Sequence, residues 1–265
     1  GYLGATSGDV IIDGHNVLDE PEEAKKCIGY LPEIPPLYTD MTVNEYLHFA
    51  AKLKKLPKDK SEDFIEQAKE MAHVKDVEGR LIKNLSKGYR QRVGLAEAIM
   101  GYPEVIILDE PTVGLDPKQI IEIRDLIKEL AKNHTVILSS HILSEVSEVC
   151  DYVLIISHGR LVASDTIDNL YKYMGETCEL EILAKADEGS FRNAIAEVPG
   201  INETECKTED DFVKATIDYD GKDDTLEAVF YALAQSRIPV YEMHKITKSL
   251  EELFIELTSD TKEAE

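Results

Sequence analysis

The apolar positions of the first 170 residues follow two alternating patterns. Four segments space apolar residues three or four apart, as an amphipathic helix does: roughly 42–53, 61–73, 87–100 and 117–130. Unbroken apolar runs lie between and after these segments, at 27–31, 105–108, 135–138 and 152–156. Strands and helices in alternation predict an α/β fold. Because runs without polar residues are typical of a helix-covered parallel sheet, we expect 105–108 and 135–138 to be buried on both faces.

Helix starts and loops are marked by particular residues. Thr42 and Glu45 have the spacing of a capping box, in which a hydroxyl and a carboxylate each satisfy a free backbone amide. Asp116 is placed as an N-cap, with Pro117 at the first helical position. Three prolines between 32 and 36 predict a loop over residues 32–40, because proline continues neither a strand nor a helix.

The order of elements changes beyond about Tyr173. We predict, in chain order, strand 177–184, helix 188–197, strands 201–206 and 211–219, helix 223–235, strand 238–246 and helix 249–258. The βαββαβ order is the ferredoxin-like arrangement. The sequence therefore predicts two domains, 1–173 and 174–265. The first would contain a helical subdomain at about 42–100.

The charge and cysteine content of the chain limit the kinds of molecule that we expect it to bind. The formal net charge is −23, and a DNA or RNA face would need clustered Lys and Arg, so we expect no nucleic-acid partner. This net charge does not prevent the binding of a single nucleotide, because local dipoles and a metal ion suffice to bind it. The four cysteines include no CxxC pair, which argues against zinc. No run approaches the roughly 18 apolar residues of a membrane span, and the first residues do not resemble a signal peptide.

Two adjacent carboxylates follow the run at 105–108. Asp109 and Glu110 would stand at the carboxyl end of a strand, where open α/β sheets bind their ligands. Adjacent side chains point in different directions. One carboxylate can therefore hold Mg²⁺ while the other polarises a water for attack on a phosphoryl group. The alternative is a strand that ends in solvated acids, and one short motif does not decide between the two.

Two further segments carry candidate chemistry. Ser86 would cap the helix at 87–100, and Gly88 leaves the backbone open so that amides and the helix dipole can meet an anion. An ordinary serine cap is the alternative. His141 follows the strand at 135–138 and would lie at the same sheet edge as the carboxylates, where an imidazole can contact a phosphate. A purely structural histidine is the alternative.

In this order and spacing, the segments resemble the ATP-binding cassette (ABC) family. LSKGY resembles the signature motif, usually LSGGQ; VIILDE resembles Walker B, GLD the D-loop and SSH the switch histidine. YLPEIPPLYTDMTVNEYL resembles the Q-loop region, and SGDVIIDGHNV the strand and turn after the Walker A helix. The resemblance covers residues 1–165. It implies a P-loop NTPase-like cassette with a helical insertion, followed by the small α+β domain.

The resemblance implies a role for each residue of the acidic pair and for the histidine. Asp109 would support Mg²⁺, Glu110 would be the general base for the attacking water, and His141 would contact the γ-phosphate of ATP. Glu33 stands where the family usually has glutamine, and a carboxylate is still an oxygen ligand for Mg²⁺. This glutamate resembles the bacterial drug-export and gliding-type members. ATP and Mg²⁺ are the expected cofactors.

Two cassettes of this family enclose two nucleotides, so each signature acts on the ATP of the other subunit. The resemblance implies that Ser86 and Gly88 bind that γ-phosphate and that Asp116 belongs to the dimer contact. Lys87 replaces the first glycine of LSGGQ and Tyr89 its glutamine, which changes the rim of the nucleotide-binding segment. The second subunit, identical or different, is thus one expected partner.

The Walker A pattern GxxxxGK[ST] does not occur in the 265 residues. In the family, a segment like the first 14 residues follows directly after that loop and its helix, and the adenine-stacking aromatic residue lies further upstream. We therefore expect both to have been lost on the N-terminal side, not mutated. The polypeptide as given is expected neither to bind ATP tightly nor to hydrolyse it.

The function implied is that of an ATP-hydrolysing transporter subunit, of export type, that powers a separate membrane permease. The loop at 35–40 and the helices over 42–73 are where the family docks its permease. The expected location is the cytoplasmic side of the cell membrane, in contact with it only through the permease. Two alternatives remain: a soluble ABC ATPase not involved in transport, and a truncated, non-catalytic partner-binding module.

Overall fold

The computed structural model describes residues 3–167, 169–170, 178–246 and 250–259. Contacts divide the chain into two compact units, residues 1–149 and 150–265. The predicted domain boundary at residues 173 and 174 lies outside the described residues and stays a prediction. Each unit is described below by itself.

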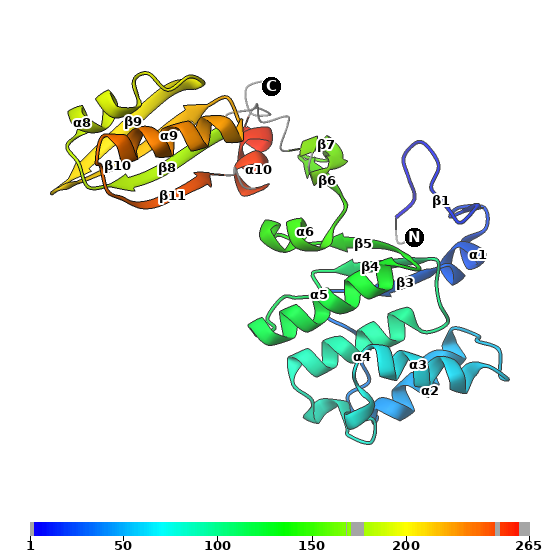
Figure 1. The fold of residues 1–265 in the computed structure, drawn as a ribbon. Helices are drawn as coiled ribbons and strands as arrows, with labels where there is room; N and C mark the ends of the chain where they lie inside the picture. Colours follow the sequence, from blue (N-terminus) through cyan, green and yellow to red (C-terminus); the bar gives the residue numbers. More distant parts are fainter. Residues whose placement is uncertain (1–2, 168, 171–177, 247–249, 260–265) are drawn as a thin grey trace. The chain divides into compact units, whose positions relative to one another are not determined.

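A parallel sheet forms the centre of the first unit (Figure 1). Its strands run in the order β3 (Ile28–Leu31), β4 (Val105–Asp109) and β5 (Thr135–Ser139). Leu108 is paired with Leu31 on one side and Leu138 on the other, so the carboxyl ends of the three strands meet at one edge. Helix α4 (Lys87–Ile99) packs against β3, and α5 (Pro117–Ala131) packs against β5.

Burial alternates along these strands. Ile106 and Leu108 of β4 join the core cluster with residues of α4 and α5, whereas the other three residues of β4 are only half-buried. Every residue of β5 is exposed or half-buried, and Ile137 is 50% exposed. The expectation of burial on both faces is therefore wrong for both strands. The reason is that β5 is an edge strand of the described sheet and that α4 and α5 share their core with one face of it.

The helical subdomain of the first unit consists of α2 (Val43–Leu53), α3 (Ser61–Met71) and two short 3₁₀ helices, Lys75–Val77 and Ile82–Asn84. The predicted capping box is present: the Thr42 hydroxyl accepts from the amide of Glu45 at 3.2 Å, and the Glu45 carboxylate accepts from the amide of Thr42 at 2.8 Å. Lys69 is buried, and its ammonium donates to Asn44 at 3.0 Å and to Glu78 at 2.8 Å. These contacts fix α2, α3 and the following turn as one body that packs on α4.

Short elements complete the first unit. β1 (Ile11–Ile12) and β2 (His15–Asn16) form a hairpin through a turn at Asp13 and Gly14, both of which have positive φ. Helix α1 (Pro21–Lys26) was not expected, because only one of its six residues is buried and no apolar periodicity marks it. Helix α6 (Leu143–Val149) ends the unit.

The second unit has its own core. β6 (Tyr152–Ser157) and β7 (Arg160–Thr166) form a hairpin. An antiparallel sheet of order β11-β8-β10-β9 follows, built in chain order from β8 (Cys178–Ala184), α8 (Glu188–Ile195), β9 (Ile201–Glu209), β10 (Phe212–Tyr219), α9 (Asp223–Gln235) and β11 (Val240–Ile246). The predicted βαββαβ order is confirmed. Helix α10 (Leu250–Ser259) ends the described chain, and the predicted first residues of β8 and α10, at 177 and 249, lie outside the described residues.

Candidate functional site

The predicted acidic pair and the histidine meet at the carboxyl edge of the parallel sheet. Asp109 is the last residue of β4, and Ser139, its partner across the sheet, is the last residue of β5. Glu110 follows β4 directly, and His141 lies two residues after β5. Because both strands end at the same level, the two loops that follow them lie side by side.

The turn at Glu110 separates the directions of the two carboxylates. Glu110 has a φ of +46°, in the left-handed region that costs a non-glycine residue about 1–3 kcal/mol. Its amide donates to the carbonyl oxygen of Ser139 at 3.1 Å and to the Ser139 hydroxyl at 3.2 Å. That hydroxyl in turn donates to Asp109 Oδ1 at 2.5 Å. Ser139 therefore holds both acidic residues, and sequence reasoning had used it only as part of the SSH motif.

Glu110 and His141 are hydrogen-bonded. His141 Nδ1 lies 2.9 Å from Glu110 Oε1, and this bond and the negative charge of Glu110 raise the pKa of His141 above its ordinary value of 6.5. The charges of Glu145 and Glu33 act in the same direction, more weakly. The second carboxylate oxygen of Glu110, Oε2, is buried and has no hydrogen-bond partner among the described residues. A buried carboxylate oxygen without a donor is an acceptor position for a water.

The donor set for a metal ion is small. No cluster of three or more His, Cys, Asp or Glu side chains that could hold a metal ion occurs in the described part of the chain. Mg²⁺ nevertheless suits such a site, because it keeps several waters and binds through one or two carboxylates together with the phosphates of its nucleotide. Asp109, at the strand end, has the chemistry for this role.

The signature segment forms a second cluster, at the start of α4. The Ser86 hydroxyl caps this helix and accepts from the amide of Tyr89 at 3.3 Å, as predicted. A Cβ atom on Gly88 would come within 2.6 Å of the Gln119 side chain, so a larger residue there must displace that side chain. The Lys87 ammonium lies directly against Gly114 of the D-loop segment.

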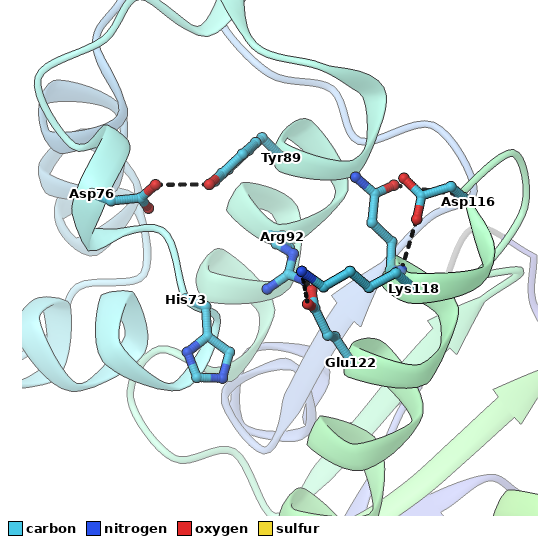
Figure 2. A pocket seen from close by; sticks show the side chains of 8 residues that line it. His73, Asp76, Tyr89, Arg92, Asp116, Lys118 and Glu122 are labelled. Carbon is cyan, nitrogen blue, oxygen red and sulfur yellow. Dashed lines mark hydrogen bonds and ion pairs between the residues drawn. The ribbon is translucent and has the colours of Figure 1, made fainter.

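The start of α5 lies beside this helix start. Asp116 caps α5, and its carboxylate accepts from the amide of Gln119 at 3.0 Å. The Tyr89 hydroxyl donates to Asp76 at 2.7 Å, which ties α4 to the 3₁₀ helix at 75–77 (Figure 2). A cavity of about 530 Å³ is bounded by these side chains together with Arg92 and Glu122, which form an ion pair. The structure thus joins the two predicted motifs, LSKGY and GLD, at one face of the unit.

Sequence reasoning overlooked a buried acid beside the first cluster. Glu145, on α6, is 4% exposed and accepts a hydrogen bond from Thr112 at 2.5 Å. The only sequence signal was its place, one helical turn after His141. From the sequence, a carboxylate at this position is expected on the solvated face of a short helix. Only the packing shows that it is buried.

The sequence of the chain is similar to those of known ABC transporter ATP-binding proteins. The family model described as "ABC transporter" matches residues 1–113. The chain is 33% identical over 266 residues to the uncharacterized ABC transporter ATP-binding protein YhcH of Bacillus subtilis, covering 99% of this chain and 82% of that protein. It is 38% identical over 184 residues to the bacitracin transport ATP-binding protein BcrA of Bacillus licheniformis, of which it covers 59%.

The fold of the chain is also similar to those of solved ABC transporter subunits. The fold matches that of an ABC transporter ATP-binding subunit with a TM-score of 0.60 and 30% identity, over 66% of this chain and 73% of that chain. It matches CbiO1 of Clostridium perfringens, part of the complex CbiONQ, with a TM-score of 0.59 and 25% identity, over 75% of this chain and 76% of that chain.

Fold and sequence thus define the class of the protein, an ATP-binding cassette with a P-loop NTPase-like architecture. The chain belongs to the family of ABC transporter ATP-binding proteins, and by family it is a nucleotide-binding ATPase. Its relatives in that family include the bacitracin transport ATP-binding protein BcrA. None of the helices in the described ranges is long and apolar enough to cross a membrane.

Proposed function

We propose that this protein hydrolyses ATP to power a separate membrane permease, and that the transporter exports its cargo. ABC ATPase subunits work with permease subunits, and CbiO1 is part of an ABC transporter complex. The observation that carries the proposal is the hydrogen-bonded pair of Glu110 and His141 at the carboxyl edge of the sheet. Its place and chemistry suit the attack of a water on a phosphoryl group.

The residues of this edge divide the chemistry. Glu110 is the general base: Oε2, the oxygen without a protein partner, accepts the proton of the attacking water. His141 is held by Oε1 and directs its other ring nitrogen toward the γ-phosphate. Asp109, oriented by the Ser139 hydroxyl, would hold Mg²⁺, and Glu33 would supply a second oxygen ligand. The ion would neutralise negative charge on the phosphates of the nucleotide.

The second cluster acts on a nucleotide held by another subunit. Ser86, Lys87 and Gly88 present the start of α4, whose free amides and dipole favour a phosphate. Tyr89 fixes the orientation of that helix through Asp76. Asp116, at the adjoining start of α5, contributes to the contact between the two subunits. The partner is a second cassette, of the same or a different sequence.

The permease interacts with the loop at 35–40 and the helices that follow. Tyr38 is exposed, and its ring meets the ring of Phe49 edge to face, with the ring centroids 5.2 Å apart. The exposed aromatic ring is available to a partner. Tyr46, by contrast, is buried and donates to Glu97, so it supports the subdomain and is no docking residue. Attachment through the permease places the protein on the cytoplasmic side of the membrane.

Replacement of the general base tests the proposal. In the protein as its gene encodes it, Glu110→Gln is expected to bind ATP with Mg²⁺ but not to hydrolyse it, so that a nucleotide-bound dimer accumulates and persists during size-exclusion chromatography. Wild type would form this dimer only transiently. Glu129→Gln, an exposed acid of α5 paired with Lys132, is the matched control and should behave as wild type. Hydrolysis by Glu110→Gln at the wild-type rate would refute the assignment.

A further inference from the structure

A buried acid links the two loops that carry the catalytic candidates. Glu145 is 4% exposed and lies on α6, whose first turn begins two residues after His141. Its Oε2 accepts from the Thr112 hydroxyl at 2.5 Å. Its Oε1 lies 3.5 Å from Arg124 Nη2 on α5. One carboxylate on α6 therefore contacts both the loop after β4 and helix α5.

Thr112 is fixed within the loop that bears Glu110. It is 4% exposed, its carbonyl oxygen accepts from the amide of Leu115 at 3.1 Å, and the amide of Val113 donates to the carbonyl oxygen of Glu110 at 3.2 Å. The loop from Glu110 to Leu115 is thus a tight turn held at its centre by Thr112. A movement of Thr112 would carry Glu110 with it.

Glu145 fixes the other loop in the same way. Its amide donates to the carbonyl oxygen of Ile142 at 3.0 Å, and the amide of Ile142 donates to the Ser140 hydroxyl at 3.1 Å. The segment that carries His141 is therefore continuous with the first turn of α6. Two side-chain bonds therefore connect the same two segments, one between Thr112 and Glu145 and one between Glu110 and His141.

Stability alone does not explain a carboxylate at this position. Burying a charge costs free energy that its partners offset only with good geometry, and an apolar residue of similar volume often stabilises as well or better. Arg124 is shared with Glu148, and its Nε is buried without a hydrogen-bond partner in the described ranges. What the arrangement provides is a fixed spacing of two loops.

We propose that Glu145 is a positioning residue for ATP hydrolysis: through Thr112 and Arg124 it sets the separation of Glu110 and His141. The proposal rests on the proposed function for its effect on turnover. Its geometric content, that the contact between Glu110 and His141 depends on Glu145, does not. A misplacement of catalytic groups by about 1 Å can cost up to about a hundredfold in rate.

The kinetic test uses Thr112→Val, which keeps the shape of the side chain and removes the hydroxyl. In the protein as its gene encodes it, assembled with its partner subunits, we expect kcat for ATP to fall about tenfold while KM stays unchanged. Thr112→Ser restores the hydroxyl and should restore most of the rate. Glu145→Gln keeps an acceptor oxygen for Thr112 and should fall between wild type and Thr112→Val.

Thr225→Val is the matched control. Thr225 is also a buried threonine bonded to a carboxylate, Asp220 at 2.7 Å, but it lies in the second unit. It should lower the melting temperature about as much as Thr112→Val and leave kcat unchanged. Equal loss of kcat in the two variants, or no loss in Thr112→Val, would overturn the proposal.

A second readout separates this proposal from the proposed function. In NMR spectra of the same protein, a nuclear Overhauser contact between the His141 ring and the Glu110 side chain is expected in wild type, in Thr112→Ser and in Thr225→Val. It should weaken or vanish in Thr112→Val. If wild type lacks ATP turnover, the proposed function fails, and the NMR contact still decides on Glu145. Persistence of the contact in Thr112→Val contradicts the positioning role.

Discussion

At the scale of single residues, the chemistry of the site depends on the ionisation of His141. The ring is exposed, and its pKa responds first to the hydrogen bond and the charge of Glu110, with burial acting more weakly in the opposite direction. Its raised pKa means that the charged imidazolium is favoured in the folded protein. The stabilisation is complete below pH 6.5, the ordinary pKa, and is lost as the pH rises through the higher folded-state value.

Removal of the Glu110 charge should therefore move this titration. In an NMR titration of the ring protons, wild-type His141 is expected to titrate above pH 6.5, and Glu110→Gln should shift its pKa downward toward 6.5. A wild-type His141 pKa at or below 6.5 would contradict the hydrogen bond.

At the scale of elements, the two helix starts at the signature and the D-loop interlock. A Cβ on Gly88 would come within 2.6 Å of Gln119, whose side chain also belongs to the capping box of α5. Gly88→Ala must displace that side chain and weaken its bond to the Asp116 amide, while the N-cap bond from the Gln119 amide to Asp116 remains. Loss of one hydrogen bond costs about 1 kcal/mol, and we expect a fall in unfolding free energy of up to about that size.

Gly79 supplies the control for this substitution. A Cβ there meets no atom within 4 Å, so Gly79→Ala should leave stability unchanged or raise it slightly. Urea denaturation of the two variants beside wild type measures the difference. A Gly88→Ala protein as stable as Gly79→Ala would show that Gln119 moves aside without cost.

Helix ends and element order were predictable because they depend on local chemistry. Thr42, Ser86 and Asp116 cap their helices in the structure as the sequence indicated. The exposure of β5 was not predictable, since an apolar run does not reveal which faces of a sheet are covered. Nor was the burial of Glu145, because a partner 33 residues away in the chain determines it.

At the scale of the whole molecule, we propose that residues 174–265 form an accessory domain. Its sheet and two helices enclose a core of their own, which includes Phe191, Ile217 and Val229. A polypeptide of these residues alone is expected to unfold cooperatively on heating, as measured by circular dichroism, with a ferredoxin-like content of helix and strand. A spectrum of unfolded chain would contradict this boundary.

The large negative charge, −23, accompanies a chain whose candidate phosphate contacts are local: a helix start, one imidazole and a metal-binding carboxylate. These features suit a bound nucleotide with its ion and do not suit a nucleic acid. Glu110 is placed by a strained turn, and this turn directly follows β4. The sheet that contains β4 belongs to the cassette fold.

Hydrolysis of ATP for a permease is measured as the rate of phosphate release from ATP by the protein as its gene encodes it, purified together with its permease. We expect steady turnover that falls at least about a hundredfold in Glu110→Gln and stays at the wild-type rate in Glu129→Gln. Turnover that is absent in wild type, or that survives in Glu110→Gln, would contradict the proposed function.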